Sequence, residues 1–266
     1  MSRTMVQEHQ ELTKQNWGFI SPEEQAQIAR TRVLLVGCGL GSNIAVLAAR
    51  TGFCRFTIAD GDAVETSNLN RQAFRMEHVG QNKAHATTSL IKEINPQAHV
   101  QAVPAFIEAR DADPLVQQSD LVVNMVDPGP ALHALLNAAT MQDKITLSPM
   151  NIAYGGMVLA FGPQSPSLEE LMGPGPDNGL FLRIIQKLMP SLPSYLWKFA
   201  PVAQRIQLEG VPPPQLGLAA SITASLVVES MVKIATGSQP PLVPNVITLD
   251  SRNPALLTWP IANNGT

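Results

Sequence analysis

Short apolar runs alternate with amphipathic segments along the first 150 residues of the chain. Residues 32–36 (RVLLV) and 56–60 (FTIAD) have the composition of buried strands, and segments with helical periodicity lie between such runs. Strands that alternate with helices indicate βαβ units and a mostly parallel sheet. The expected strands cover residues 32–36, 56–60, 99–103, 119–127 and 144–150, and the expected helices cover 42–52, 82–94, 111–118 and 130–142.

The pattern is less regular after residue 150. Residues 151–161 fit paired strands, and residues 162–179, with four prolines and four glycines, predict a loop or lid. A helix is expected over 216–235, and closing strands are expected over 246–250 and 255–259. The apolar stretch of that helix is about 13 residues long, shorter than the roughly 20 that a membrane span needs. We therefore expect a core or interface helix and no membrane anchor.

These elements predict an α/β fold of the Rossmann-like type. We expect a mostly parallel sheet with helices on both faces, and a proline-rich C-terminal half that completes the sheet. Within this single domain we distinguish an N-terminal arm and helix (residues 1–30), a nucleotide-binding part (31–150) and an acceptor and dimer part (151–266).

Charge is unevenly distributed between the two halves. Residues 1–147 carry 12 basic and 15 acidic side chains, whereas residues 148–266 carry six of each and 16 of the 22 prolines. A net charge of −3 argues against binding to nucleic acid or to an anionic membrane surface, because both need a basic surplus. Only 15 % of the residues are charged, against about 25 % in average soluble domains. We therefore expect the second half to be covered, most simply in a homodimer.

The cysteine content indicates a reducing compartment. Cys38 and Cys54 are too few for a disulfide framework and belong to no Cys-x-x-Cys pair of a zinc site. The histidines are scattered, and the polar N-terminus lacks the apolar core of a signal peptide. We expect a cytoplasmic protein without zinc.

Glycines stand at the first strand-to-helix junction, in the run GCGLGS. A tight turn there can aim backbone N–H groups and the positive end of a helix at a phosphate, although such a turn also occurs without a ligand. Asp60 ends the next strand, 23 residues after Gly37, close to the spacing of about 20 at which an acid accepts ribose hydroxyls. Together the two features indicate a nucleotide site.

Charged residues near this site discriminate between nucleotide reactions. Arg71 and Lys83 follow Asp60 and could neutralise the pentavalent transition state and departing pyrophosphate of an attack on ATP. A nicotinamide enzyme has no need of them, although each could also be an ordinary surface charge. Asp127 ends a buried strand at the edge where ligands bind, and could hold Mg²⁺ or a ribose, or cap the following helix.

Several segments, taken in order and at their spacing, resemble the ThiF-type adenylyltransferases. These relatives of the ubiquitin-activating enzymes, with members in the molybdopterin and thiamine pathways, adenylate carboxylates. The segments are RVLLVGCGLGSN, FTIADGDAVETSNLNRQ, VGQNKA followed by KEINP, LVVNMVD, and ASLVVESMVKIATG. They lie between about residues 30 and 150 and between 216 and 237.

The resemblance implies which residues contact ATP and Mg²⁺. The implied set is Gly37, Gly39 and Gly41 in the nucleotide loop, Asp60 at the ribose, Asn68, Arg71 and Lys83 around the triphosphate, and Asp127 at the metal.

Three features depart from the family pattern. The family loop is usually G-x-G-G-x-G, so one residue is missing here, and Asn124 stands where a second aspartate is usual. In the family an Arg-Asn pair from the other subunit of a dimer reaches the triphosphate; here Gln15 occupies the arginine position, with Lys14 beside it. Lys14 can supply charge in trans but not the bidentate fork of an arginine.

We therefore expect an adenylyltransferase that activates a carboxylate as an acyl-adenylate. The acceptor is the C-terminus of a ubiquitin-like or sulfur-carrier protein, a peptide, or a small acid. No thioester is expected on this chain, because its second half has no cysteine. Two alternatives remain: a degenerate relative that binds nucleotide or a partner protein without catalysis, and an NAD-dependent oxidoreductase.

Overall fold

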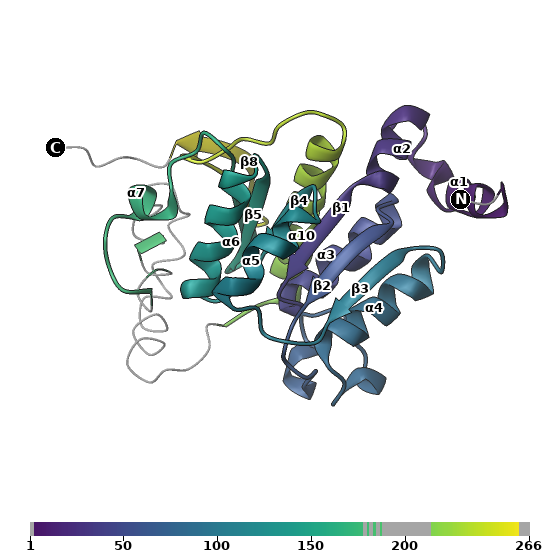
Figure 1. Ribbon diagram of the computed structural model, residues 1–266, viewed down its shortest axis with the longest axis horizontal. Coiled ribbons are helices and arrows are strands. Elements are labelled where there is room, and N and C mark those ends of the chain that lie inside the picture. Colours follow the sequence, from purple (N-terminus) through teal and green to yellow (C-terminus); the bar gives the residue numbers. More distant parts are fainter. Residues whose placement is uncertain (1–2, 178–179, 181–182, 185–186, 188–213, 261–266) are drawn as a thin grey trace.

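The computed structural model describes residues 3–260, except residues 178–179, 181–182, 185–186 and 188–213. The strands form one sheet in the order β3-β2-β1-β4-β5-β6-β7-β8, in which β1 to β5 are parallel and β6 to β8 are antiparallel (Figure 1). The strands are β1 (Arg32–Val36), β2 (Arg55–Ala59), β3 (His99–Val103), β4 (Leu121–Asn124), β5 (Ile145–Ile152), β6 (Gly155–Phe161), β7 (Asn245–Asp250) and β8 (Asn253–Pro260).

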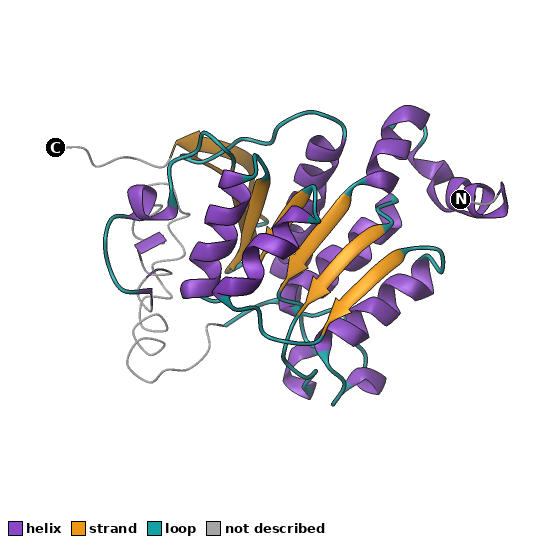
Figure 2. Ribbon diagram, viewed as in Figure 1, coloured by secondary structure: helices purple, strands orange, loops and turns teal. Residues whose placement is uncertain are grey.

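Helices cover both faces of this sheet (Figure 2). Apolar side chains of α3, α4 and α10 share one core with β1, β2, β4 and β5, and those of α5 and α6 pack on the opposite face. The helices are α1 (Arg3–Thr13), α2 (Pro22–Arg30), α3 (Gly39–Thr51), α4 (Lys83–Ile94), α5 (Ala112–Gln117), α6 (Pro130–Met141), α7 (Leu168–Met172) and α10 (Gly217–Ala235), with short 3-10 turns η1 (Lys14–Asn16), η2 (Thr66–Asn68), η3 (Met76–His78) and η4 (Ala109–Asp111).

The expected α/β architecture is confirmed: the fold is Rossmann-like, helices lie on both faces, and the C-terminal strands extend the sheet. Two local expectations are wrong. The strand expected to end at Asp127 ends at Asn124, because the Asn124 side chain accepts the backbone N–H of Val126 at 3.1 Å and turns the chain. The loop expected over 162–179 contains α7, whose N-cap Ser167 forms a capping box with Glu170.

Helix α10 is a core helix along β5 and β6. It is long and apolar enough to cross a membrane, as buried helices of soluble proteins also are, and half of its most apolar stretch is buried in the fold. A Cβ atom on Gly156 of β6 would lie 1.9 Å from Thr223 Oγ1, so the helix and the strand approach more closely than a side chain would permit. Glu229 and Lys233, four residues apart, form an ion pair of 2.7 Å on the exposed side of the helix.

The ends of the central strands define where a ligand can bind. Val36 at the end of β1 is in register with Ala59 of β2 on one side and with Asn124 of β4 on the other. The loops that follow these strands therefore start at the same edge of the sheet. The strand order changes direction at β1 and β4, and such a switch point is where open α/β sheets bind ligands.

Candidate nucleotide and acyl-transfer site

The glycine loop between β1 and α3 is shaped by close backbone contacts. Gly37 has a φ of +93° and donates its N–H to Ala59 O at 2.8 Å. A Cβ atom at this position would also lie 3.0 Å from the backbone oxygen of Met125, so only glycine fits without strain. A Cβ on Gly41 would lie 2.8 Å from side-chain atoms of Leu35 and Met125, which explains the close packing of α3 on the sheet.

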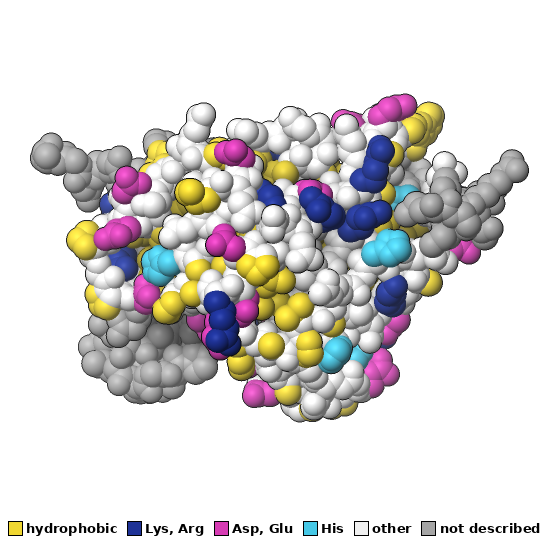
Figure 3. Space-filling model, in the orientation of Figure 1, with side chains coloured by type: hydrophobic (Ala, Val, Ile, Leu, Met, Phe, Trp, Pro, Cys, Tyr) yellow, Lys and Arg dark blue, Asp and Glu magenta, His cyan; other side chains and the backbone are white. Residues whose placement is uncertain are grey.

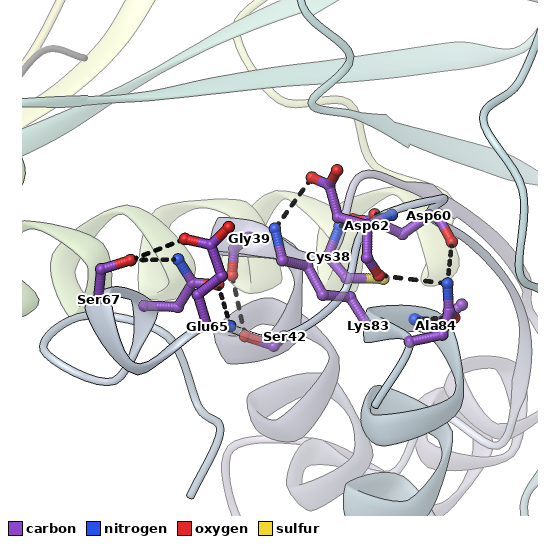
Figure 4. A network of polar contacts seen from close by, with 11 residues as sticks. Cys38, Gly39, Ser42, Asp60, Asp62, Glu65, Ser67, Lys83 and Ala84 are labelled. Atoms are coloured by element: carbon purple, nitrogen blue, oxygen red, sulfur yellow. Dashed lines mark hydrogen bonds and ion pairs between the residues drawn. The ribbon is translucent and has the colours of Figure 1, made fainter. Parts of the chain in front are cut away.

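The side chain of Asp60 lies against this loop. Its carboxylate accepts the backbone N–H of Cys38 at 2.5 Å and that of Asp62 at 2.8 Å (Figure 4). Each oxygen thus has one N–H partner, and its remaining lone pairs are available to a ribose hydroxyl. Asp60 therefore also fixes the loop that follows β1.

Lys83 is placed at the same edge by the start of α4. Asn82 caps this helix by accepting the N–H groups of Ala84 and His85, and it donates to Asp60 O at 2.9 Å. The Lys83 side chain is only 11 % exposed, and its ammonium lies 3.0 Å from the Asp62 carboxylate (Figure 4). Lys83 is thus a largely buried cation paired with Asp62, and not an ordinary surface charge.

The loop over residues 65–73 carries Asn68 and Arg71. Asn68 is buried, and its amide bonds within the loop, to Glu65 N at 3.1 Å and to Ser67 Oγ at 3.5 Å. Asn68 therefore shapes the loop in this structure. Arg71 is half-buried, and its guanidinium donates to Ser67 O at 2.9 Å and to Asn70 Oδ1 at 2.8 Å.

Side chains of α3 join this loop to the glycine loop. Ser42 Oγ donates to Gly39 O at 2.9 Å and accepts the N–H of Ala73 at 3.0 Å, and Asn43 donates to Arg71 O at 2.8 Å. The sequence reasoning did not select Ser42 or Asn43. Both lie on the predicted helix that follows the glycines, but no spacing rule indicates that they contact a loop some 30 residues later.

Some buried polar atoms at this edge have no hydrogen-bond partner in the described part of the chain. They include Gln72 Oε1 and Asn124 Nδ2. The Gln72 amide nitrogen also lies 3.3 Å from the position of a Cβ on Gly39, so the Gln72 side chain covers the start of α3. Unpartnered buried groups are costly, and a polar ligand over the glycine loop would satisfy them. Gln72 is the last residue of FTIADGDAVETSNLNRQ, one of the segments that resemble the family, so the sequence could have indicated it as a site residue.

Asp127 lies in the loop after β4 and is exposed. No group of three or more His, Cys, Asp or Glu side chains lies close enough to hold a metal among the described residues. A single carboxylate still suits Mg²⁺, which proteins commonly bind through one or two carboxylates together with phosphate oxygens and water. The Asp127 carboxylate is therefore a suitable ligand for Mg²⁺ that is bound as a complex with a nucleotide.

Lys14 lies far from the glycine loop of its own chain. Asn16, two residues on, bonds to Gln25 and to Thr51 O at the C-terminal end of α3, whereas the glycine loop is at the N-terminal end. The length of α3 separates these ends by about 18 Å. Lys14 itself is exposed and pairs with Glu11. Hydrogen bonds thus join the glycine loop to Asp60 and to the loop that carries Asn68 and Arg71, and Asn82 ties the start of α4, where Lys83 lies, to Asp60. Asp127 lies in the loop that leaves the same edge of the sheet, and Lys14 lies away from this group.

Both cysteines are buried. Burial, together with the nearby charge of Asp60, raises the pKa of the Cys38 thiol. Burial also raises the pKa of Cys54. Both groups are therefore protonated thiols at neutral pH, unsuited to act as nucleophiles.

Charged side chains are scattered among uncharged ones on the face shown in Figure 3. Several Lys and Arg side chains lie near one another in the upper right half of this view, with acidic side chains around them. This distribution agrees with the low charge content of the sequence.

The sequence model of the ThiF family matches residues 12–264. Over 157 residues the chain is 31 % identical to the sulfur carrier protein adenylyltransferase of Thermus thermophilus, covering 58 % of this chain and 57 % of that protein. Over 162 residues it is 27 % identical to the SAMP-activating enzyme E1 of Haloferax volcanii, covering 60 % of each. The matched part thus spans less than two thirds of these relatives.

Solved structures share the fold. A crystal structure of PaaA superposes with a TM-score of 0.70 at 20 % identity and covers 98 % of this chain and 75 % of that one. Escherichia coli MccB in complex with ATP gives 0.66 at 18 % identity, with coverage of 90 % and 66 %. These likenesses support the Rossmann-like architecture.

Proposed function

The chain belongs to the ThiF family, and we propose that it is an ATP-dependent adenylyltransferase that activates a carboxylate as an acyl-adenylate. One observation carries the proposal. The glycine loop, the Asp60 carboxylate and the buried Lys83 ammonium lie together at the switch-point edge of the sheet. A dinucleotide oxidoreductase would use the loop and the acid, but a buried ammonium beside them serves phosphoryl chemistry.

In the proposed reaction, a carboxylate oxygen of the acceptor attacks the α-phosphorus of ATP in line with the leaving group. A bond forms between this oxygen and the α-phosphorus, the bond to the β-phosphate oxygen breaks, and pyrophosphate leaves with the electron pair. Asp60 orients the ribose. Lys83 and Arg71 stabilise the negative charge that develops on the phosphoryl oxygens, and positioned cations are the main protein contribution to such reactions.

Asp127 would hold Mg²⁺ together with oxygens of the triphosphate. When bound, the metal would neutralise charge on the phosphates. Asn124 occupies the position of a second carboxylate in the family pattern, so this chain contributes fewer anionic ligands. We expect a weaker apparent affinity for Mg²⁺ as a result.

We propose that the acceptor is the C-terminal carboxylate of a small protein or peptide. The sulfur-carrier and SAMP-activating relatives support a protein acceptor by their names, and MccB was solved in complex with the peptide MccA. The acyl-adenylate would pass to an external nucleophile, because both cysteines are buried neutral thiols.

We further propose that the protein is a cytoplasmic homodimer. Lys14 lies at the end of α3 away from the glycine loop, so its charge can assist catalysis only from a second subunit. Trp17 and Phe19, on the segment after Lys14, are 77 % and 95 % exposed, and such large apolar side chains are commonly covered by a partner.

The experiment is ATP–pyrophosphate exchange with labelled pyrophosphate, Mg²⁺ and a panel of acceptors. The panel contains a sulfur-carrier protein, the same protein with its C-terminal carboxylate amidated, and a short peptide. Exchange that requires the free carboxylate supports the proposal. ATP binding without exchange for any acceptor would indicate a degenerate binder, and tight NAD binding without ATP binding would contradict the proposal altogether.

A further inference from the structure

Three segments that are distant in the sequence meet at Gln215, two residues before α10 begins. Its side-chain oxygen accepts the Nε–H of Arg71 at 3.0 Å and the amide of Asn151 at 3.4 Å. Its backbone oxygen accepts the Asn70 amide at 3.4 Å. Gln215 thus joins the loop that carries Arg71 to the end of β5 and to the start of α10.

The backbone around this contact is tightly packed. A Cβ atom on Gly217 would lie 2.7 Å from Asn70 O and 3.7 Å from the Cα of Arg71. The first turn of α10 therefore rests directly against the Arg71 loop. Gln215 is fixed in place by this packing and by its own backbone contact, so its side chain is a well-placed acceptor.

The Arg71 guanidinium is held by hydrogen bonds from two of its three nitrogens. A guanidinium has five N–H donors in one plane. Nε is bonded to Gln215, and Nη1 is bonded to Ser67 O and Asn70 Oδ1, which uses three of the five. Within the described residues, Nη2 has no hydrogen-bond partner. The plane of the guanidinium is thus set from two sides while one edge stays available to an anion.

We propose that Gln215 is a positioning residue for Arg71: it fixes the guanidinium plane so that the Nη2 edge faces the transferred phosphoryl group. This inference rests on the proposed function, because it assigns Arg71 to the triphosphate. Gln215 does not touch the substrate. It acts through Arg71 and makes the orientation of that residue depend on the segment that leads into α10.

The test is a double-mutant cycle between Gln215 and Arg71, read as kcat and KM for ATP in pyrophosphate exchange. Gln215→Met keeps the length of the side chain and removes the acceptor. We expect kcat to fall roughly ten- to hundredfold, the scale of a misplaced catalytic group, with a small change in KM. In an Arg71→Ala background the same substitution should cause no further loss.

Gln215→Glu is the conservative variant. It restores an oxygen acceptor for the Arg71 Nε–H, so kcat should recover toward the wild-type value, whereas the added negative charge near the triphosphate should raise KM for ATP. Gln118→Met is the matched control, because Gln118 is an exposed residue at the end of α5 whose side chain donates to Pro114 O, in its own helix. It should leave both constants unchanged. A thermal melt of each variant identifies any that fails to fold.

Each outcome decides a different point. A loss in Gln215→Met that vanishes in the Arg71→Ala background supports the inference. If Arg71→Ala lowers kcat and a folded Gln215→Met does not, the inference is wrong and the proposed function stands. If Arg71→Ala has no effect, the phosphate role of Arg71 and this inference both fall. Absence of exchange in the wild type with every acceptor overturns the proposed function and the inference together.

Discussion

The Asp60 carboxylate lies 2.5 Å from the backbone nitrogen of Cys38, so the acid at the end of β2 holds the glycine loop at the end of β1. A negative charge at this point compensates the N–H groups that converge at the start of α3. The residue that we assign to ribose binding is therefore also part of the structure of the loop. Substitutions at Asp60 should affect stability as well as nucleotide affinity.

Replacement of Asp60 by alanine should show both effects. The backbone N–H groups of Cys38 and Asp62 would lose their acceptor, which should lower the free energy of unfolding by about 1–3 kcal/mol. Affinity for ATP should fall at least about tenfold, because a charged acceptor contributes on this scale. Urea unfolding and calorimetric titration with ATP measure the two effects separately.

Asp60→Asn separates the two roles of this residue. The amide oxygen can still accept one of the two N–H groups, so the loss of stability should be smaller than in Asp60→Ala, while ATP affinity should remain low. An Asp60→Ala protein with wild-type stability would contradict the structural role.

The second prediction concerns Lys83. Lys83→Met keeps an apolar side chain of similar length in the buried position and removes the ammonium. Pyrophosphate exchange should fall by about 10²- to 10³-fold, the scale seen when one group that stabilises transition-state charge is removed. The matched control is Lys233→Met on α10, which breaks an exposed pair with Glu229 and should cost less than about 0.5 kcal/mol of stability. Equal exchange in the two variants would contradict the assignment of Lys83.

Local patterns predicted the frame of this site. Three kinds of site residue could be recognised because they stand at the ends of predicted elements. They are the glycines after the first strand, Asp60 at the end of the second strand and Lys83 at the start of a helix. Since parallel strands end at one edge of a sheet, the topology alone places these residues near one another. The hydrophobic periodicity that predicts the strands and helices is a local property of the sequence, and it was sufficient to predict the fold class.

Contacts between distant segments could not be predicted in this way. Gln215 lies 144 residues after Arg71, in a proline-rich stretch without periodicity, and its role depends on how α10 packs against the loop. The early end of β4 has a similar cause. The side chain of Asn124 competes with the strand for the N–H of Val126, and a reading based on hydrophobicity continues the strand to Asp127.

The third prediction concerns the cysteines. Because burial raises the pKa of both thiols, neither should form a thioester with the acceptor. A Cys38→Ala, Cys54→Ala chain should retain pyrophosphate exchange within about threefold of the wild type, with some loss of stability because both replaced side chains are buried. Non-reducing electrophoresis with labelled acceptor should show no thiol-sensitive adduct on the wild type. An adduct that disappears in the double variant would contradict the prediction.

The last prediction is a pH dependence of stability from Arg32 and Asp120, which join the starts of β1 and β4. Partial burial raises the pKa of Asp120, but its hydrogen bonds from the Arg32 guanidinium and backbone, with the Arg32 charge, outweigh this and hold the pKa below its usual value. A carboxyl with a lowered folded pKa stabilises the protein above its unfolded pKa of about 3.9, and that stabilisation is lost as the pH falls through the folded pKa.

Asp120→Asn should therefore lower the melting temperature at pH 6 to 7, and the difference from the wild type should shrink below about pH 4. The two side chains are 48 % and 42 % exposed, so solvent screening should limit the effect to about 1 kcal/mol. This corresponds to roughly 2–4 °C in a chain of this size. Glu169→Gln, on the exposed side of α7, serves as the control for the loss of one acidic charge at the surface. A difference that stays constant down to pH 2 would show that the amide substitution acts through packing, without a contribution from the titration of Asp120.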